Sequence, residues 1–255
     1  MGFALASVLP AWLVRRTVGG AAEQSSNWQS FRKAALAAPY YKARPIARTS
    51  VVELADFYRC HGEFLNPAAP VPPPAPIALN WEPLPKTLAV KPWFRLQPPV
   101  ETLMDPDQVS PGRACEVLAG PVSVLVSLAE RRPALSSPVY GVIAFTGVSQ
   151  PPLTPAIRDA LWAAWRTPVF EQFRGFQGEL LGSECEAFDG LHFDPDAAVW
   201  EERGDGELLL TSLVNLRHPA WRLATGRRGR LDHSACPCGS PLSRIAWARD
   251  RKSVV

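Results

Sequence analysis

The sequence predicts an α/β protein in which a mostly parallel sheet with helices is followed by a small β-rich subdomain. Two patterns carry this prediction. Between residues 115 and 173, short apolar runs of strand type alternate with segments of helical periodicity, and this alternation is typical of α/β layers. After Phe188 the helical periodicity ends, and short strand-like runs flank a Gly204-Asp205-Gly206 turn, which indicates an antiparallel β unit.

Residues 1–66 predict an N-terminal helical segment. The apolar run Phe3–Val14 is too short to span a bilayer, and two arginines follow it instead of preceding it. A buried amphipathic helix is therefore favoured over a signal peptide, and no membrane span is expected. Two further helices are predicted at Ser25–Ala38 and Val51–Cys60.

Residues 67–112 predict a proline-rich connection. Its core, Pro70–Pro76, excludes a helix or a central strand and is typical of extended polyproline II. Short strands are expected at Thr87–Val90 and Trp93–Leu96. A surface linker is the simpler interpretation of the proline core, and a proline motif for an adaptor protein is the alternative.

Residues 113–188 supply the predicted α/β layer. Its strands and helices are expected in the order Cys115–Leu118, Val122–Arg131, Val139–Phe145, Thr154–Trp165 and Val169–Phe173. The third run is apolar at nearly every position, the pattern of a strand that is covered on both faces. Thr154 is the expected cap of the second helix, because Pro155 after it suits the first helical position.

Residues 189–255 predict the β-rich subdomain. The runs Leu191–Phe193, Ala198–Glu201 and Glu207–Thr211 are expected to be short strands. Further strands are expected at Trp221–Ala224 and Arg230–Asp232. The glycine-bounded turn at 204–206 joins two of these runs, so that pair is expected to be antiparallel.

The composition is that of a soluble globular chain. Of 255 residues, 47% are hydrophobic and 20% are charged, which is the range of ordinary folded domains. A net charge of +3 is too small to indicate a nucleic-acid partner by itself. Five cysteines without the spacing of a small secreted scaffold favour a reducing compartment with metal-bound or free thiols. We therefore expect a cytoplasmic protein that does not bind nucleic acid.

Three thiols and one imidazole form a candidate metal site at Cys185, His192, Cys236 and Cys238. This donor set is that of a tetrahedral structural zinc site. The Cys-x-Cys pair is tighter than usual and the Cys-to-His spacing is looser, so two interpretations are open, a structural zinc and thiols without metal. A zinc ion with four protein ligands has no open position and would stabilise the subdomain without catalysing a reaction. His233 is a substitute ligand nearby in the sequence.

Other charged residues offer weaker candidates. Glu179, Glu184 and Asp189 are carboxylates of the kind used in acid–base catalysis, and the favoured interpretation is solvated loop charges or partners of His192. A run of five arginines is most simply interpreted as a solvated basic face. The alternative is that these arginines bind an anion. That run comprises Arg217, Arg222, Arg227, Arg228 and Arg230.

Several short motifs occur in a specific order along the chain: Gly120-Pro121-Val122-Ser123, Thr146-Gly147-Val148 with Leu153–Arg158, Glu184-Cys185 with Gly190-Leu191-His192, Glu207–Asn215, and Cys236-Pro237-Cys238-Gly239. In this order they resemble the phenylacetate–CoA ligase-like branch of the adenylate-forming (AMP-binding) enzymes. The resemblance covers about half of the chain well. It implies a partial N-terminal domain of such an enzyme, truncated and degenerate.

The resemblance also implies where two sites lie. An acyl pocket is expected at Phe145, Gly147, Gly175 and Gly178. The positions equivalent to the nucleotide site are expected at Phe173, Phe176, Gln177, Arg222 and Arg227.

Departures from the family pattern lie at the nucleotide positions. Gln177 stands where the family has a glutamate that helps to hold the metal, and an amide lacks the negative charge that Mg²⁺ requires. Arg227 stands where the family has a ribose-binding aspartate, and a guanidinium has no acceptor. The region 67–107 contains no glycine, whereas the family wraps phosphate with a glycine-rich loop. We expect the family's C-terminal lid, with its catalytic lysine, to be absent, because ten residues follow Ile245.

We therefore expect a degenerate adenylate-forming homologue without ATP/Mg²⁺ chemistry and with no catalytic residues. We expect it to act as a non-catalytic partner of another protein, or else to bind a small carboxylic-acid or acyl ligand. One alternative is an atypical ATP-dependent carboxylate–CoA ligase or acyl-transfer enzyme that a partner completes. A zinc-stapled protein-interaction module is the other.

Overall fold

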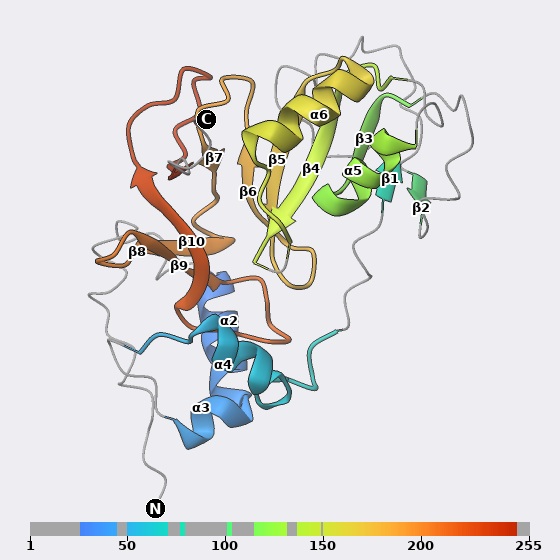
Figure 1. Ribbon diagram of the computed structural model, residues 1–255. Coiled ribbons are helices and arrows are strands. Elements are labelled where there is room, and N and C mark those ends of the chain that lie inside the picture. The colour runs from blue at the N-terminus through green and yellow to red at the C-terminus, as the bar shows by residue number, and fades with distance from the viewer. Residues whose placement is uncertain are drawn as a thin grey trace, which may run out of the picture. The chain divides into compact units, whose positions relative to one another are not determined.

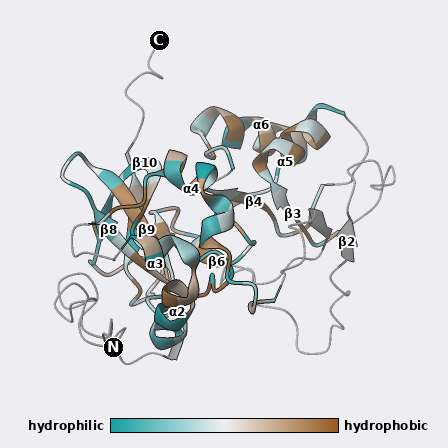
Figure 2. Ribbon diagram, turned by 90° about the horizontal axis from the view of Figure 1, so that it is seen from below, coloured by the Kyte–Doolittle hydropathy of each residue, from teal (hydrophilic) through white to brown (hydrophobic). Residues whose placement is uncertain are grey.

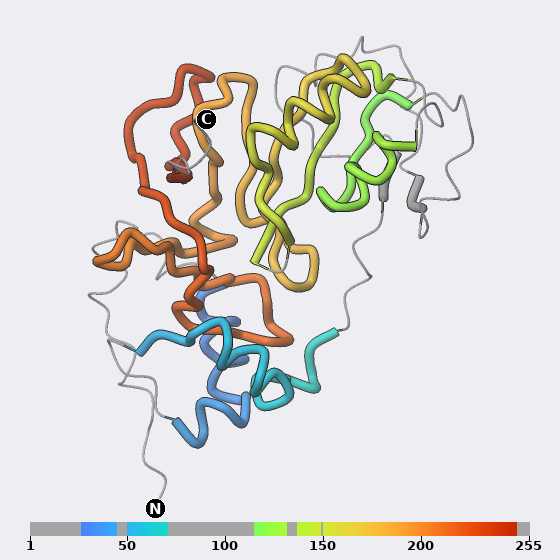
Figure 3. Tube along the Cα trace, viewed as in Figure 1, coloured from blue at the N-terminus to red at the C-terminus, as the bar shows by residue number. Residues whose placement is uncertain are grey.

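The computed structural model describes residues 26–44, 50–70, 77–79, 101–103, 115–131, 137–148 and 150–248 (Figure 1). The predictions at Phe3–Val14, Thr87–Val90 and Trp93–Leu96 lie outside these residues, as does most of the proline core. The chain divides into two compact units. Unit 1 comprises Met1–Pro72, Phe193–Ser234 and Leu242–Val255, and unit 2 comprises Pro73–His192 and Ala235–Pro241. The colour gradient of Figure 3 follows the chain from blue on the N-terminal side to red on the C-terminal side.

Unit 2 is built on a mixed sheet with the strand order β2-β1-β3-β4-β5-β6-β7. The strands are β1 (Ile77–Leu79), β2 (Glu101–Leu103), β3 (Val117–Pro121), β4 (Gly141–Gly147), β5 (Val169–Arg174), β6 (Leu180–Glu184) and β7 (Leu191–His192). Strands β3, β4 and β5 are parallel neighbours. The pairs β1–β2, β1–β3, β5–β6 and β6–β7 are antiparallel.

The connections explain this mixture of directions. Helix α5 (Val122–Glu130) connects β3 to β4, and helix α6 (Pro155–Trp165) connects β4 to β5, as parallel neighbours require. A short turn at residues 175–179 joins β5 to β6, and a turn of this length can only reverse the chain. The predicted α/β class is confirmed, but the described strands form a mixed sheet and not a mostly parallel one.

Both faces of the three parallel strands are buried. On one face, side chains of α5 and α6 pack on the strands, with Leu125 and Leu161 fully buried beside Val142. On the other face, Ile143 and Phe170 belong to a second buried cluster. Hydrophobic and hydrophilic residues occupy different parts of α6 in Figure 2, as expected for a helix with one face in the core.

Helix α6 begins as the sequence predicts. The Thr154 side chain caps the helix, because its Oγ1 accepts a hydrogen bond from the backbone N–H of Ile157 at 3.3 Å. Pro155 occupies the first turn, where its missing N–H costs no hydrogen bond. The helix ends at Trp165, and the next residue, Arg166, has a left-handed backbone with φ of 53°.

Unit 1 combines helices with an antiparallel sheet of the order β11-β10-β9-β8. Its elements are α2 (Ser26–Ala37), α3 (Pro39–Ala43), α4 (Leu54–Arg59), η3 (His61–Phe64), β8 (Ala198–Glu202), β9 (Glu207–Ser212), β10 (Leu223–Asp232) and β11 (Arg244–Trp247). The turn at 204–206 joins β8 to β9, as predicted. The two strands predicted around residues 221–232 are one strand, β10, with a register shift between Ala224 and Arg228.

Aromatic side chains hold the helices of unit 1 to its sheet. Trp28 of α2 packs against Trp221 with ring centroids 5.5 Å apart. The Tyr41 hydroxyl accepts a hydrogen bond from the backbone N–H of Trp221 at 2.6 Å. Burial raises the pKa of Tyr41 above its ordinary value, so the hydroxyl stays neutral. Among the described helices, none has both the length and the apolar character needed to cross a membrane.

Candidate functional site

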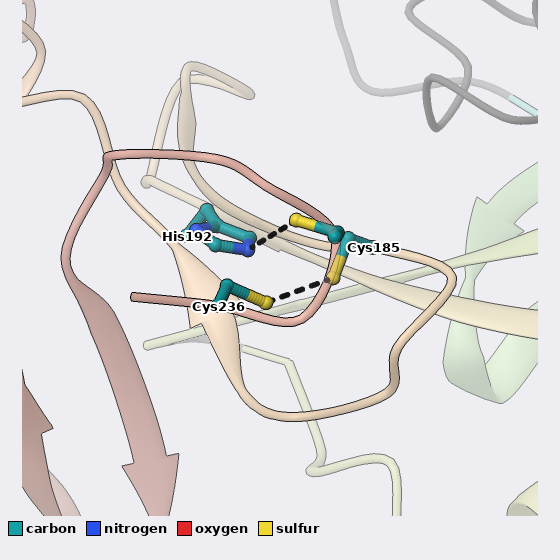
Figure 4. A group of neighbouring side chains, drawn as sticks. Cys185, His192 and Cys236 are labelled. Carbon is teal, nitrogen blue, oxygen red and sulfur yellow. Dashed lines mark hydrogen bonds between the residues drawn. The ribbon is translucent and has the colours of Figure 1, made fainter. Parts of the chain in front are cut away.

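The four predicted metal ligands lie together in unit 2. Cys185 directly follows β6, His192 belongs to β7, and Cys236 and Cys238 lie in the turn at 235–241. Their ligand atoms all lie within 4.8 Å of one another. Two pairs are close: Cys185 Sγ lies 3.7 Å from Cys236 Sγ, and Cys238 Sγ lies 3.5 Å from His192 Nε2. Figure 4 shows the side chains of Cys185, His192 and Cys236 gathered at one point.

The separations within the two close pairs fit a tetrahedral zinc ion. With Zn–S bonds of about 2.3 Å and Zn–N bonds of about 2.0 Å, tetrahedral angles place two sulfurs about 3.8 Å apart and a sulfur and a nitrogen about 3.5 Å apart. The two close pairs have these separations within about 0.1 Å. The donor set and its spacing therefore match a site that could hold a metal ion.

A hairpin explains the loose spacing between the first two ligands. Strands β6 and β7 pair antiparallel, with Glu184 opposite Leu191 and Ser183 opposite His192. The loop between the strands therefore returns His192 to the side of Cys185. Gly190 has a φ of 89° in this loop, a left-handed conformation that glycine adopts without strain.

A tight turn explains the close spacing of the other two ligands. The backbone N–H of Gly239 donates to the carbonyl of Cys236 at 2.9 Å, and Gly239 has a φ of 78°. The backbone N–H of Ser240 donates to Cys238 Sγ at 3.4 Å.

The metal ligands are mostly buried. Cys185, His192 and Cys236 are 8%, 9% and 4% exposed, and Cys238 has intermediate burial. Burial raises the pKa of the Cys185 thiol to about 12 in the metal-free protein. A metal ion therefore has to displace the thiol proton, which makes metal affinity depend on pH. His233 hydrogen-bonds through Nδ1 to Ser243 Oγ at 2.8 Å and is not a member of this cluster.

A buried ion pair lies next to the first metal ligand. Arg158 Nη2 of α6 donates to both carboxylate oxygens of Glu184, at 2.9 and 3.0 Å. Glu184 Oε2 also accepts a hydrogen bond from the backbone N–H of Glu171 at 2.8 Å, and Arg158 Nη1 donates to the carbonyl of Val169. The two side chains thus take the place of a neighbouring strand at this end of β5. We name the pair the Arg158–Glu184 clamp.

The environment of Glu184 corrects the prediction of a solvated loop charge. Its side chain is 8% exposed. Burial raises the pKa of the Glu184 carboxyl, and Arg158 acts in the opposite direction. Asp189, in contrast, is exposed, and Glu179 is partly buried. The three carboxylates that were considered together as acid–base candidates therefore have different environments.

The predicted acyl-pocket residues lie where β4 and β5 end. Phe145 and Gly147 belong to the last part of β4, and Gly175 and Gly178 belong to the turn after β5. A Cβ atom on Gly147 would lie 2.3 Å from the carbonyl oxygen of Arg174, so only glycine permits this close approach of the two strands. Ligands of open α/β sheets bind at the carboxyl ends of parallel strands.

The turn after β5 is closed by its own side chain. Glu179 Oε2 accepts a hydrogen bond from the backbone N–H of Gln177 at 2.8 Å, and its backbone carbonyl accepts one from Gly175 at 2.8 Å. The Glu179 carboxylate lies against the Cα of Gly175, where a Cβ would meet it at 2.1 Å. The Glu179 carboxylate is therefore the hydrogen-bond partner of one backbone donor of the turn, the Gln177 N–H.

Arg174 is the cation nearest to this turn in the sequence. Its guanidinium lies 4.7 Å from the ring centroid of Phe145, and it donates to the carbonyl of Gly178 at 3.0 Å and to Gln172 Oε1. Burial lowers the pKa of Arg174 to about 10, while Glu179 acts in the opposite direction. The guanidinium thus stays charged at neutral pH. Phe173, before it, is fully buried, and Phe176 is partly buried in the turn.

Arg222 and Arg227, the other predicted nucleotide-site equivalents, belong to unit 1. Arg222 has a φ of 47°, and its Nε donates to Glu201 Oε2 at 3.0 Å in a pair whose side chains are 15% and 9% exposed. The Arg227 guanidinium lies 5.7 Å from the ring centroid of Trp247. The structure therefore gives Arg222 a buried ionic partner and Arg227 an aromatic one.

The sequence prediction missed a polar network beneath α6. Thr146 Oγ1 donates to Glu171 Oε1 at 2.6 Å, and these residues are 0% and 3% exposed. Together with the Arg158–Glu184 clamp they connect β4, β5, β6 and α6. One signal was present in the sequence: Glu171 and Gln172 interrupt an apolar strand, and a charge there has to find a buried partner.

Comparison with known proteins gives matches in structure. No protein-family model matches the sequence, and no curated protein sequence is similar to it. The fold is similar to 2-hydroxyisobutyryl-CoA ligase in the postadenylation state in complex with R3-HIB-AMP. That match has a TM-score of 0.54 at 14% identity and covers 97% of this chain and 72% of that chain.

Further structures of the same ligase give similar values. In complex with 2-HIB-AMP and CoA in the thioesterification state, the TM-score is 0.51 at 13% identity, over 97% of this chain and 72% of that chain. In the postadenylation state with 2-HIB-AMP, the TM-score is 0.51 at 14% identity, over 96% and 72%. An open conformation is matched over 52% of this chain and 32% of that chain, with a TM-score of 0.41. The first three matches show that the chain shares the fold of 2-hydroxyisobutyryl-CoA ligase over nearly its whole length.

Proposed function

We propose that this chain is a non-catalytic relative of the adenylate-forming enzymes, of the phenylacetate–CoA ligase-like branch. Its proposed role is that of a cytoplasmic partner of another protein or of a protein that binds a small carboxylic acid or acyl group. The observation that carries the loss of catalysis is the hydrogen bond from the Gln177 N–H to the Glu179 carboxylate, at 2.8 Å.

This hydrogen bond works against nucleotide phosphate. Adenylation depends on positioning phosphate oxygens and on stabilising their charge with backbone donors, cations and Mg²⁺. In the turn after β5, a protein carboxylate takes a backbone donor and adds a negative charge. A phosphate brought to this turn would meet repulsion from Glu179.

Gln177 supports the same proposal. By the family resemblance it stands where a glutamate helps to hold Mg²⁺, and its amide is neutral. Mg²⁺ sites rely on carboxylates together with substrate phosphates. The one carboxylate of this turn, that of Glu179, already accepts the hydrogen bond from the Gln177 N–H.

A small acid is the ligand that the retained residues suit best. Arg174 supplies a positive charge beside the ring of Phe145, near the carboxyl ends of β4 and β5, where open α/β sheets bind their ligands. A guanidinium binds a carboxylate with two parallel hydrogen bonds, and an aromatic ring suits the apolar part of an aryl or acyl group.

Pyrophosphate release tests the loss of catalysis. The purified protein is supplied with ATP, Mg²⁺, CoA and a panel of short aliphatic and aryl carboxylic acids. We expect pyrophosphate formation at the rate of a sample without protein. Acid-dependent release above that rate would refute the proposal and favour the ligase alternative.

Binding of the acid is measured separately. We expect one or more acids of the panel to raise the thermal midpoint of the protein, because a ligand of the folded state stabilises it. Arg174→Met should abolish that shift, whereas Arg166→Met, an exposed cation over Trp162, should retain it. If no acid of the panel shifts the midpoint, the partner role remains and the ligand role is refuted.

We also propose that zinc is the resident metal of the Cys₃His cluster and that it has a structural role. The spacing of the ligand atoms supports this role, because all four tetrahedral positions would be taken by protein atoms. Bound zinc would join the loop after β6 to the turn at 235–241. Elemental analysis of the purified protein should give about one zinc per chain, and the variant Cys236→Ser should give far less.

A further inference from the structure

We propose that Cys185 and Cys236 form a redox-sensitive thiol pair, which a hydroperoxide converts into a disulfide with release of the bound metal. This inference rests on the proposed zinc role. It does not depend on whether the chain has lost ligase activity.

The geometry selects this pair of cysteines. Their Sγ atoms are 3.7 Å apart and the residues are 51 positions apart in the sequence. A disulfide requires an S–S distance of about 2.05 Å, so the two sulfurs have to approach by about 1.7 Å. Both residues lie in connections, the loop after β6 and the turn at 235–241, which can move more easily than strand residues.

The neighbouring cysteines suit a disulfide less well. Only Pro237 separates Cys236 from Cys238, and the proline ring fixes one backbone dihedral between them. Cys238 Sγ instead lies 3.5 Å from His192 Nε2 and accepts the N–H of Ser240. Cys60 ends α4 in unit 1, and Cys115 packs in the core cluster beside α5.

The chemistry requires one two-electron oxidant. The Cys185 thiolate, which is more exposed than Cys236 at 8% against 4%, attacks the terminal oxygen of the hydroperoxide. The O–O bond breaks, an alcohol or water leaves, and Cys185 becomes a sulfenic acid. The Cys236 thiolate then attacks the Cys185 sulfur, the S–O bond breaks, and the hydroxide leaves as water after taking a proton. The hydroperoxide has been reduced by two electrons, and the two thiolates have been oxidised to a disulfide.

Metal release follows from the loss of two ligands. The disulfide sulfurs no longer carry the negative charge that binds zinc, so Cys238 and His192 are the protein ligands that remain. The new bond joins the same two segments that the metal held, the loop after β6 and the turn at 235–241. Unit 2 therefore keeps a cross-link at this position in both states.

The experiment oxidises the full chain and follows two products. Reduced, zinc-loaded protein is treated with increasing hydrogen peroxide, released zinc is measured with a chromogenic chelator, and disulfides are located by peptide mapping without reductant. We expect one zinc released for each Cys185–Cys236 bridge formed. Reductant together with zinc should reverse both changes.

Variants separate this pair from the other cysteines. Cys60→Ser and Cys115→Ser should leave the bridge and the zinc release unchanged. Cys238→Ser, loaded with zinc through its three remaining ligands, should still form the Cys185–Cys236 bridge, and Cys236→Ser should not form a bridge to Cys185. Secondary structure is checked for each variant by circular dichroism before oxidation.

Two results would overturn the inference. The first is a Cys236–Cys238 bridge as the main product, and the second is zinc release that accompanies sulfinic acids without any bridge. Absence of zinc in the purified protein would refute the zinc role instead. Mapping the metal-free protein would then still decide whether Cys185 and Cys236 pair.

Discussion

Removing Arg158 tests how strongly the Arg158–Glu184 clamp holds unit 2 together. Arg158→Met keeps most of the side-chain length and removes the charge. The Glu184 carboxylate then stays buried, and the Glu171 N–H still donates to it at 2.8 Å. Its pKa should rise further, because burial already raises it and Arg158 is the charge that opposes this effect.

The expected loss follows from the burial of the two partners. Breaking a buried ion pair by removing one partner costs about 3–5 kcal/mol. The Glu184 side chain is 8% exposed, but that of Arg158 is 27% exposed, so water screens part of the interaction. We therefore expect Arg158→Met to lower the free energy of unfolding by about 2–3 kcal/mol.

Urea unfolding followed by circular dichroism at fixed zinc concentration measures this loss. Arg166→Met is the matched control, since Arg166 is exposed and lies 4.4 Å from the ring centroid of Trp162, and it should cost less than about 1 kcal/mol. Glu184→Gln and the double variant complete a thermodynamic cycle, in which the double variant should lose less than the sum of the single losses. Equal small losses for Arg158→Met and Arg166→Met would refute the role of the clamp.

Three further perturbations test other parts of the structure. Gly147→Ala should destabilise the protein by about 1–3 kcal/mol, because the added Cβ would lie 2.3 Å from the Arg174 carbonyl oxygen. The control is Gly204→Ala, whose added Cβ has no heavy atom within 4 Å, and it should be nearly neutral in the same urea assay. Burial, followed by the charges of His61 and Arg217, lowers the pKa of His218 to about 4. In the unfolded chain the pKa of histidine is about 6.5, so the unfolded state binds more protons than the folded state between about pH 4 and about pH 6.5. The stability from neutral His218 is therefore present above about pH 6.5 and falls as the pH drops toward 4, and His218→Asn should flatten that part of a urea-midpoint profile. Removing zinc with a chelator should cost about 3 kcal/mol when the metal had been present at about 100 times its Kd, and a thermal midpoint that the chelator leaves unchanged would contradict the structural role.

The local signals of the sequence were sufficient for many elements. Thr154 and Pro155 mark the start of α6, and the glycine-bounded turn at 204–206 marks the hairpin of β8 and β9. In both places the residues that determine the conformation lie within a few positions of one another. Strand β6 is not among the predicted elements, because Leu180–Glu184 has no β-branched residue and contains Gly182. Its strand conformation comes from pairing with β5 and β7.

The candidate sites show the same limit. The donor types of the metal cluster can be predicted because cysteine and histidine are the usual zinc ligands. The position of Glu184 could not be predicted, since its partner Arg158 lies 26 residues away and no local pattern connects them. The same holds for Glu179, whose carboxylate reaches the Gln177 N–H only because the backbone turns at Gly178, with a φ of 80°.

Strand β6 explains how the proposed loss of nucleotide chemistry is compatible with a retained metal cluster. The strand begins directly after the turn that Glu179 closes and ends directly before Cys185. Its register is fixed by pairing with β5 and β7 and, at Glu184, by the Arg158–Glu184 clamp. These contacts are made within the protein and require no nucleotide. Substitutions in the turn at 175–179 can therefore remove phosphate binding while β6, the clamp and the metal ligands keep their positions. Within the proposed function, the metal cluster and the clamp hold one end of β6. Before the other end, the Glu179 carboxylate accepts the hydrogen bond of the Gln177 N–H in place of a ligand.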